Sequence, residues 1–199
     1  MPVQSYVNGR YVRHHGAAIH IEDRGYQFAD GVYEVIAVYG GGIVDEGPHL
    51  ERLFRSLGEL NIAAPGSERS IKVILREVLF RNRVRDGALY LQVSRGVAVR
   101  NHAHPPDMKP AFVVTARAHP WPKDFAAVEG IAVIAIADQR WSRCDIKTVS
   151  LLPNVLARMG ADTAGADDAW MIGEDGLVTE GTASNAWIVT DAGEIVTRQ

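Results

Sequence analysis

One stretch of the chain, DIKTVSLLPN at residues 145–154, places a lysine between an extended apolar run and the start of a helix. Of the 21 Lys and Arg residues only four are lysines, at positions 72, 109, 123 and 147, so the chain uses arginine where it needs only surface charge. Lys147 is therefore a candidate for chemistry that needs an amine. Arginine stays protonated in proteins, whereas a buried lysine can lose its proton and attack a carbonyl carbon. The alternative is a lysine at a strand end with its ammonium group in water.

The composition is that of an ordinary globular protein. The 199 residues are 47% hydrophobic and 23% charged, enough for one large domain or two small ones. A net charge of −3 gives no reason to expect a nucleic-acid partner, and no apolar run is long enough to span a membrane. The first residues lack the basic start and apolar core of a signal peptide, and the single cysteine, Cys144, cannot form an intrachain disulfide. We therefore expect a cytoplasmic protein that binds neither nucleic acid nor membrane, and we predict no metal site.

The first half of the chain alternates strand and helix patterns. Asn8-Gly9 predicts a hairpin over residues 6–12, because this pair supplies the positive φ values of a tight turn. Residues 23–31 contain two glycines and two aspartates and are expected to form a loop. Two helices are predicted, one from Pro48 to Leu60 and one capped by Ser67. Further strands are predicted at 32–39, 43–44, 88–93 and 111–116, with a long loop at 94–106.

The second half begins after a candidate linker, residues 119–123, in which two prolines disfavour regular structure. The continuous apolar run at 131–136 is typical of a strand buried on both faces. A helix is predicted from Pro153, a residue suited to a first helical turn. Its expected buried stripe consists of Leu152, Val155, Leu156 and Met159. Further strands are predicted at 169–172, 177–180, 186–189 and 194–196.

Three groups of polar residues are candidates to share a site with Lys147. Glu180 ends a predicted strand, where a carboxylate is either solvated or available to a protonated ring nitrogen. The turn at 182–184, Thr-Ala-Ser, offers hydroxyl and N–H groups to an anion or a ring hydroxyl. Arg100 and His102 lie in the long loop, which is either a carboxylate-binding segment or a flexible basic loop.

The pattern leaves two further choices open in the first half. Tyr33 and Glu34 are adjacent in a strand, so they point to opposite faces of the sheet. Arg52 and Arg55 both lie off the leucine stripe of their predicted helix, and periodicity does not show whether either is more than a solvated arginine.

Taken as a set, these runs resemble the fold-type IV pyridoxal-phosphate enzymes, most closely the D-amino-acid aminotransferases. The matching runs, in the order of the family, are EDRGYQF at 22–28, DGVYEV at 30–35, RG through RNH at 95–102, RW through RCDIK at 140–147, and TEG through SN at 179–185. The resemblance implies an α+β fold of two domains with the cofactor in the cleft between them. The N-terminal domain would cover residues 1–118, the linker 119–123, and a β-rich C-terminal domain 124–199, incomplete relative to the family.

The resemblance also implies a role for each candidate residue. Lys147 would hold pyridoxal 5′-phosphate covalently, and its freed amine would carry a proton between the substrate Cα and the cofactor. Glu180 would bind the pyridine nitrogen, and Ser184 would be a further cofactor contact. Arg52, rather than Arg55, would bind the phosphate. The expected carboxylate trap for the substrate consists of Tyr33, Arg100 and His102. In the family the Arg and His of the trap come from the other subunit, so a homodimer is implied.

The implied reaction is amino transfer from a D-amino acid, such as D-alanine, to a 2-oxo acid, such as 2-oxoglutarate. The Arg-Asn-His run at 100–102 favours D-amino acids over branched-chain L-amino acids. It also argues against 4-amino-4-deoxychorismate lyase, a relative of the same fold that eliminates pyruvate. A third alternative is a truncated, non-catalytic remnant that only dimerises or binds a ligand.

Overall fold

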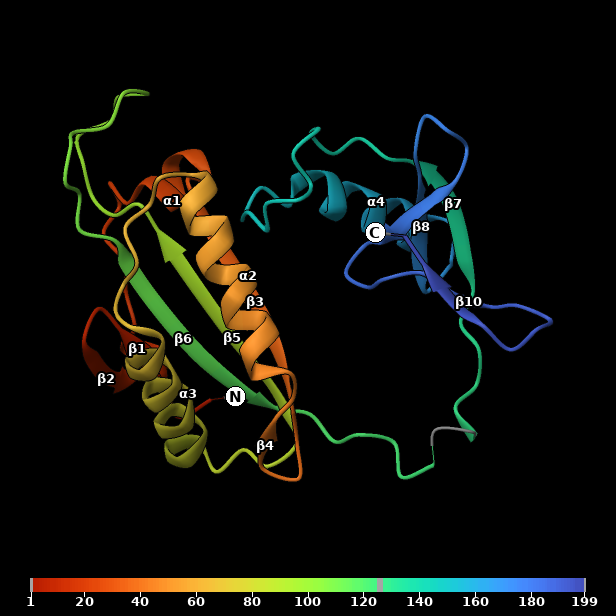
Figure 1. Cartoon of the computed structure of the whole chain (residues 1–199), viewed down its shortest axis with the longest axis horizontal. Helices are drawn as coiled ribbons and strands as arrows, with labels where there is room; N and C mark the ends of the chain where they lie inside the picture. Colours follow the sequence, from red (N-terminus) through yellow and green to blue (C-terminus); the bar gives the residue numbers. More distant parts are fainter. Residues whose placement is uncertain (1, 125–126, 199) are drawn as a thin grey trace. The chain divides into compact units, whose positions relative to one another are not determined.

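The computed structural model describes residues 2–124 and 127–198, which divide into two compact units. The first unit contains residues 2–123 together with Asp145–Val149, and the second contains the remaining described residues. Helices and strands are mixed in both, as expected for an α+β protein (Figure 1).

The first unit is built on a six-stranded antiparallel sheet in the order β2-β1-β6-β5-β3-β4. The predicted hairpin about Asn8 and Gly9 is confirmed: both residues have positive φ and join the first two strands. A short 3-10 helix, His14–Gly16, follows them. The strands are β1 (Gln4–Val7), β2 (Arg10–Arg13), β3 (Gly31–Tyr39), β4 (Gly42–Ile43), β5 (Gly87–Ser94) and β6 (Ala111–Ala118).

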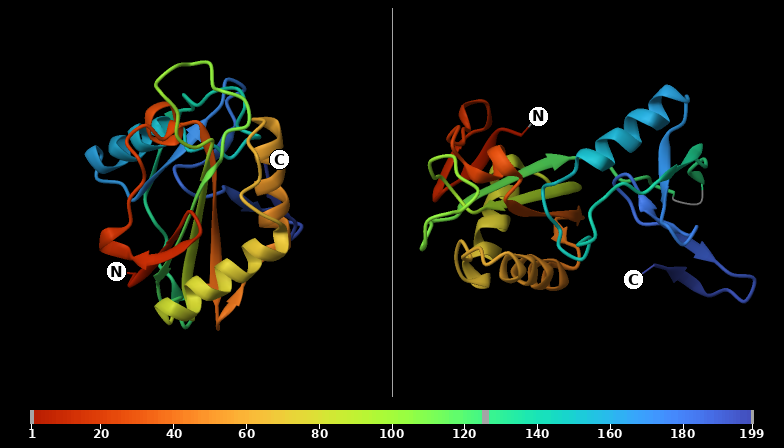
Figure 2. Two further views of the ribbon diagram at one scale, coloured as in Figure 1. Left: turned by 90° about the vertical axis from the view of Figure 1, so that its left-hand side faces the viewer. Right: turned by 90° about the horizontal axis from the view of Figure 1, so that it is seen from above.

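Two helices, α2 (Glu46–Glu59) and α3 (Glu68–Asn82), cover one face of this sheet (Figures 1 and 2). Both were predicted, and the Ser67 side chain caps α3 as expected by accepting a hydrogen bond from the Ser70 N–H. The leucines of α2 and the apolar face of α3 form one core with alternate residues of β3, β5 and β6.

The expected loop at 23–31 is wrong in its central part, which forms a short helix, α1 (Arg24–Phe28). Asp23 caps it by accepting a hydrogen bond from the Gly25 N–H at 2.9 Å, and Ala29 ends it in the left-handed conformation. The two glycines and two aspartates that indicated a loop thus include the cap of a single helical turn.

The stretch at Asp145–Val149 groups with the first unit, although it lies within the predicted C-terminal domain, residues 124–199. It runs along the start of β3, where the Tyr33 N–H donates to the Lys147 carbonyl and the Val149 N–H to the Gly31 carbonyl. Its side chains alternate as in a strand. Ile146 is buried in the core beneath the helices, while Lys147 contacts Tyr33 on the other face.

The second unit contains a three-stranded sheet in the order β7-β8-β9, a separate hairpin and one helix. The pairing of β7 with β8 is parallel, and that of β8 with β9 is antiparallel. The elements are β7 (Val133–Ala137), α4 (Leu152–Thr163), β8 (Asp168–Ile172), β9 (Val178–Gly181), β10 (Trp187–Val189) and β11 (Ile195–Thr197).

Two burial predictions in this unit are wrong. The expected stripe of α4, Leu152, Val155, Leu156 and Met159, is exposed. The helix instead packs on the sheet through the small residues Ala157 and Ala161, and a Cβ added at Gly160 would lie 3.4 Å from the Ile136 side chain. β7 is only half-buried and is not covered on both faces.

Candidate active site

Lys147 lies against the aromatic ring of Tyr33. Its Nζ atom is 3.4 Å from the Tyr33 hydroxyl and 4.5 Å from the ring centroid. The Lys147 backbone is fixed by Tyr33 on one side and by the Ser56 hydroxyl, which accepts from its N–H, on the other. Among the described residues of the first unit, no carboxylate forms an ion pair with the Lys147 amine. The amine thus lies over a phenol and is not bound to a described carboxylate of its unit, and an amine is the group that can bond to a carbonyl carbon.

Tyr90 supports Tyr33 from the neighbouring strand. The two rings stack with their centroids 5.8 Å apart and their planes 29° apart, and the Tyr90 hydroxyl donates to the Gln92 side chain at 2.6 Å. Burial, and then the nearby Tyr33, raise the pKa of Tyr90, so this phenol keeps its proton and stays neutral. Tyr90 was not predicted as a site residue. The pairing of β3 with β5 identifies it, because Tyr90 lies opposite Val35, two residues beyond Tyr33 along β3.

Arg52 makes an ion pair with Glu34 on the helix-covered face of β3. Glu34 is completely buried, and Arg52 Nε and Nη2 donate to its two oxygens at 2.7 Å each. His49 Nδ1 lies 2.8 Å from the same carboxylate. Hydrogen bonding to Glu34 raises the pKa of Arg52, so this side chain is a fixed cation that remains 43% exposed. Of the adjacent pair Tyr33 and Glu34, Tyr33 therefore faces Lys147.

Arg55, the alternative to Arg52, has a different partner. Its guanidinium donates to the Asp145 carbonyl at 2.7 Å and lies 3.9 Å from the Asp145 carboxylate. Arg55 therefore anchors the stretch that carries Lys147.

Arg100 and His102 are exposed and lie together around Phe28 of α1. The guanidinium carbon of Arg100 is 4.7 Å from the centre of the Phe28 ring, and the His102 ring is 5.5 Å from it. Arg100 and His102 therefore lie near each other. Within the described part of the chain, neither side chain forms a hydrogen bond with Tyr33. The base of their loop is closed at Gly96, where φ is +102° and an added Cβ would lie 2.0 Å from the Lys109 carbonyl oxygen.

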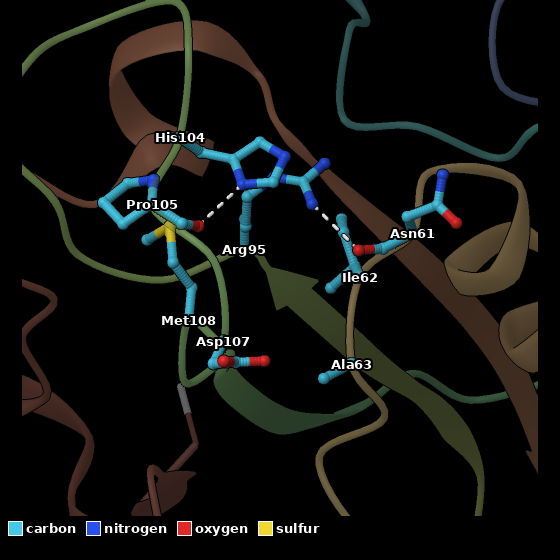
Figure 3. A pocket seen from close by; sticks show the side chains of 8 residues that line it. All are labelled: Asn61, Ile62, Ala63, Arg95, His104, Pro105, Asp107 and Met108. Carbon is cyan, nitrogen blue, oxygen red and sulfur yellow. Dashed lines mark hydrogen bonds between the residues drawn. The ribbon is translucent and has the colours of Figure 1, made fainter.

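A hollow of about 330 Å³ lies beside this loop (Figure 3). The loop residues His104, Pro105, Asp107 and Met108 line one side, and the α2–α3 connection lines the other. Arg95 lies at the back and donates to the Asn61 carbonyl at 3.0 Å. Its donors are thus used to join two segments of the chain.

Glu180 belongs to a charged cluster in the second unit. Arg140 bridges two carboxylates, donating to Glu180 and to Asp138, and the Thr179 hydroxyl also donates to Asp138 at 2.7 Å. The hydrogen bond from Arg140 holds the pKa of Asp138 far below its ordinary value, although burial opposes the shift. Glu180 is thus a carboxylate oriented by an arginine, and its side chain remains 36% exposed.

Ser184 lies in a turn that closes on Asp168. The Thr182 hydroxyl and, at 3.4 Å, the Ser184 hydroxyl both donate to the Asp168 carboxylate. The Gly181 N–H donates to the Ser184 carbonyl at 2.7 Å, and the Asn154 side chain of α4 donates to the Thr182 carbonyl. Burial raises the pKa of Asp168, but the hydrogen bonds it receives outweigh burial and lower it overall. The turn at 182–184 is therefore a fixed structure with Ser184 at its exposed end.

Neither Asp138 nor Asp168 was singled out from the sequence. Asp138 follows a strand and Asp168 begins one, and their contacts with Thr179 and Thr182 join positions far apart in the sequence, so only the folded chain brings these groups together. Among the described residues, no group of three metal-ligating side chains is found, and no helix is long and apolar enough to cross a bilayer.

Comparison with known proteins adds a match over most of the chain. A family model described as amino-transferase class IV matches residues 31–199. The D-alanine aminotransferase of Bacillus licheniformis is 44% identical over 91% of this chain and 63% of its own length. That of Listeria innocua is 39% identical over 93% of this chain and 64% of its own. The chain thus spans less than two thirds of the length of these relatives.

Solved structures show a similar fold at low identity. The branched-chain amino acid aminotransferase of Escherichia coli is similar over 99% of this chain and 66% of its own, with a TM-score of 0.85 and 20% identity. The T.th. branched-chain amino acid aminotransferase, complexed with N-(5'-phosphopyridoxyl)-L-glutamate, is similar over 98% and 66%, with a TM-score of 0.86 and 24% identity. Identities this low carry the fold but not the substrate.

Proposed function

The chain belongs to the class IV aminotransferase family, and on that premise we propose that it is part of an enzyme that transfers an amino group from a D-amino acid to a 2-oxo acid. The proposed substrates are D-alanine and 2-oxoglutarate, and the proposed cofactor is pyridoxal 5′-phosphate. The placement of the Lys147 amine over the Tyr33 ring, with no carboxylate partner in its unit, is the observation that carries the proposal.

The relatives support the substrate class. Proteins named D-alanine aminotransferase are 38–44% identical over nine tenths of this chain, whereas the branched-chain enzymes are similar at 19–24% identity. The long loop of this chain offers a guanidinium, Arg100, and an imidazole, His102, as donors for a carboxylate.

The residues present fit the cofactor. Lys147 supplies an amine that can bond covalently to its aldehyde, and the exposed side of Arg52 leaves Nη1 to a phosphate while two other nitrogens hold Glu34. Glu180, oriented by Arg140, supplies a carboxylate for the ring nitrogen, and Ser184 supplies a hydroxyl. When bound, the cofactor serves as an electron sink for the bond that breaks at the substrate Cα.

The remaining steps belong to the residues of this chain. Once its amine is free, Lys147 would take the proton from the substrate Cα and deliver it to the cofactor. Tyr33 supports this amine through its ring and its hydroxyl, and Tyr90 keeps the ring in place. Arg100 and His102 hold the substrate carboxylate, which orients the Cα–H bond. We also propose that the enzyme is a cytoplasmic homodimer in which this pair comes from the partner subunit.

Turnover with defined substrates tests the function. The protein is incubated with 2-oxoglutarate and either D-alanine or L-leucine, and glutamate is measured; a separate incubation with aminodeoxychorismate is assayed for pyruvate. Glutamate formed with D-alanine, at a rate well above that with L-leucine, is expected. Pyruvate from aminodeoxychorismate would assign the lyase instead. A purified protein that shows no cofactor absorbance band after addition of pyridoxal 5′-phosphate would be a non-catalytic member of the family.

A further inference from the structure

Arg24, in the first turn of α1, is a buried arginine with three separate partners. Its residue is only 5% exposed. Nε donates to the Asp30 carboxylate at 2.8 Å, Nη1 to the Asn101 carbonyl at 2.5 Å, and Nη2 to the His102 carbonyl at 3.0 Å. A buried guanidinium must be paired and hydrogen-bonded to be stable, so these contacts fix both Arg24 and the backbone that it binds.

The carboxylate beneath Arg24 is itself held from a second side. Arg95 donates to both oxygens of Asp30, at 2.8 and 3.0 Å. Burial raises the pKa of Asp30, but hydrogen bonds from Arg95 and Arg24 outweigh it, so the pKa is lowered overall and the group stays ionised. Arg24 is therefore anchored at Asp30, and its other nitrogens point to the loop.

Phe28, one turn after Arg24, presents its ring to the same loop. The guanidinium carbons of Arg24 and Arg100 lie 4.8 and 4.7 Å from the centre of this ring, and the His102 ring lies 5.5 Å away. Residues four apart on a helix share a face, so α1 offers the loop both a hydrogen-bond donor and an aromatic platform. The backbone is held at residues 101 and 102 and the side chain at residue 100.

We propose that Arg24, assisted by Phe28, is a positioning residue that sets the loop conformation in which Arg100 and His102 meet the substrate carboxylate. This role rests on the proposed function, and it assigns to α1 the control of affinity for carboxylate substrates. Arg24 itself touches no substrate; it acts through the Asn101 and His102 carbonyls.

Arg95 provides a matched control. It is also a buried arginine on Asp30, but Nη2, besides its bond to Asp30, donates to the Leu60 carbonyl. Its Nη1 donates to the Asn61 carbonyl in the α2–α3 connection (Figure 3). Arg24→Lys and Arg95→Lys each keep the positive charge and lose the planar set of donors. A merely structural role for Arg24 predicts similar effects of the two changes.

The kinetic test uses D-alanine as substrate and propionate as a carboxylate-only inhibitor. Arg24→Lys should raise the KM for D-alanine and the inhibition constant of propionate about tenfold, with kcat within about twofold of wild type and cofactor content unchanged. Arg24→Lys added to the double variant Arg100→Ala/His102→Ala should cause no further rise, because the two donors that Arg24 positions are then already absent. Arg95→Lys should leave both constants near wild type. Additive effects, or equal losses in Arg95→Lys, would overturn the proposal.

Hydrogen exchange provides a readout that needs no turnover. Amides of residues 97–108 should exchange faster in Arg24→Lys than in wild type or Arg95→Lys, while the amides of β5 and β6 stay protected. Unchanged exchange in a folded Arg24→Lys protein would refute the anchoring role.

Phe28→Leu, which removes the aromatic platform but keeps an apolar side chain, is a second variant that serves if Arg24→Lys does not fold. It should raise the KM for D-alanine and the inhibition constant of propionate, as Arg24→Lys does. Absence of transamination in wild type would count against the proposed function, and the exchange result would still decide whether Arg24 holds the loop.

Discussion

Lys147 shows how a single residue obtains its environment from strand alternation. The Ile146 side chain lies in the core, and the next side chain, Lys147, lies on the opposite face against Tyr33. The backbone hydrogen bonds to β3 fix this placement. A residue placed in this way is difficult to substitute by arginine, whose larger guanidinium keeps its proton.

Lys147→Ala and Lys147→Arg should each lower transamination by about a thousandfold or more, because no other group supplies the amine. Borohydride reduction of the wild-type protein with its cofactor, followed by peptide mapping, should label Lys147. The far-ultraviolet circular dichroism of both variants should match wild type. Labelling of Lys72, Lys109 or Lys123 instead would show that the assignment is wrong.

Glu34 is a completely buried carboxylate whose charge is balanced by Arg52, with His49 beside it. Glu34→Gln keeps the shape but leaves Arg52 with a neutral partner, which should lower the free energy of unfolding by about 2 kcal/mol. Urea denaturation measures this change. Glu77→Gln, which breaks an exposed pair with Arg81 on α3, should stay within about 0.5 kcal/mol of wild type and serves as the control. Equal effects would mean that Glu34 is not stabilised by its partners.

At the scale of elements, the first sheet and its two large helices were predictable because local pattern and tertiary contact agree. Turn chemistry at Asn8-Gly9, the Ser67 cap and the leucine stripe of α2 each point to the structure that forms. The α+β class and the likeness to fold-type IV enzymes are confirmed by the family match and the solved structures.

The errors arise where two patterns compete within one element. α4 carries a stripe of large apolar residues and a face of small ones, and the small face packs on the sheet because Ala157, Gly160 and Ala161 allow a close approach. Periodicity locates both faces but does not show which of them is buried.

For the candidate site, Lys147 could be predicted from the sequence, and the roles of the other residues could be predicted from the resemblance. The partners Tyr90 and Asp138, and the anchor Arg24, depend on contacts between distant segments.

Asp138 connects the end of β7 to β9 and should make the second unit sensitive to acid. The hydrogen bond from Arg140 lowers the pKa of Asp138 in the folded protein, so the unfolded chain binds this proton more readily. Its contribution to stability is therefore present above the ordinary carboxyl pKa and is lost as the pH falls below about 4. Hydrogen exchange of β7–β9 amides should show a loss of protection between about pH 5 and pH 2 in wild type and a smaller one in Asp138→Asn. The same pH dependence in both proteins would exclude Asp138 as the source.

For the whole molecule, the proposed homodimer makes a prediction that single substitutions cannot test. If Arg100 and His102 act on the partner's site, Lys147 and Arg100 of one active site come from different subunits. A heterodimer of Lys147→Ala and Arg100→Ala then contains one site with both defects and one site with neither.

Mixing the two variants, with brief denaturation and refolding to exchange subunits, should therefore restore activity on D-alanine. Random pairing makes about half of the dimers heterodimers, each with one intact site of two, so recovery should approach about a quarter of the wild-type rate. Mixtures of Lys147→Ala with Lys147→Arg should recover nothing, because every site then lacks the amine. If Arg100 acts within its own subunit, every site of the mixed dimer carries one defect, and the Lys147→Ala and Arg100→Ala mixture should stay at the low activity of its parents. Size-exclusion chromatography with light scattering, applied to the same samples, shows whether dimers form at all, so that a monomeric protein is distinguished from a dimer whose loop does not cross.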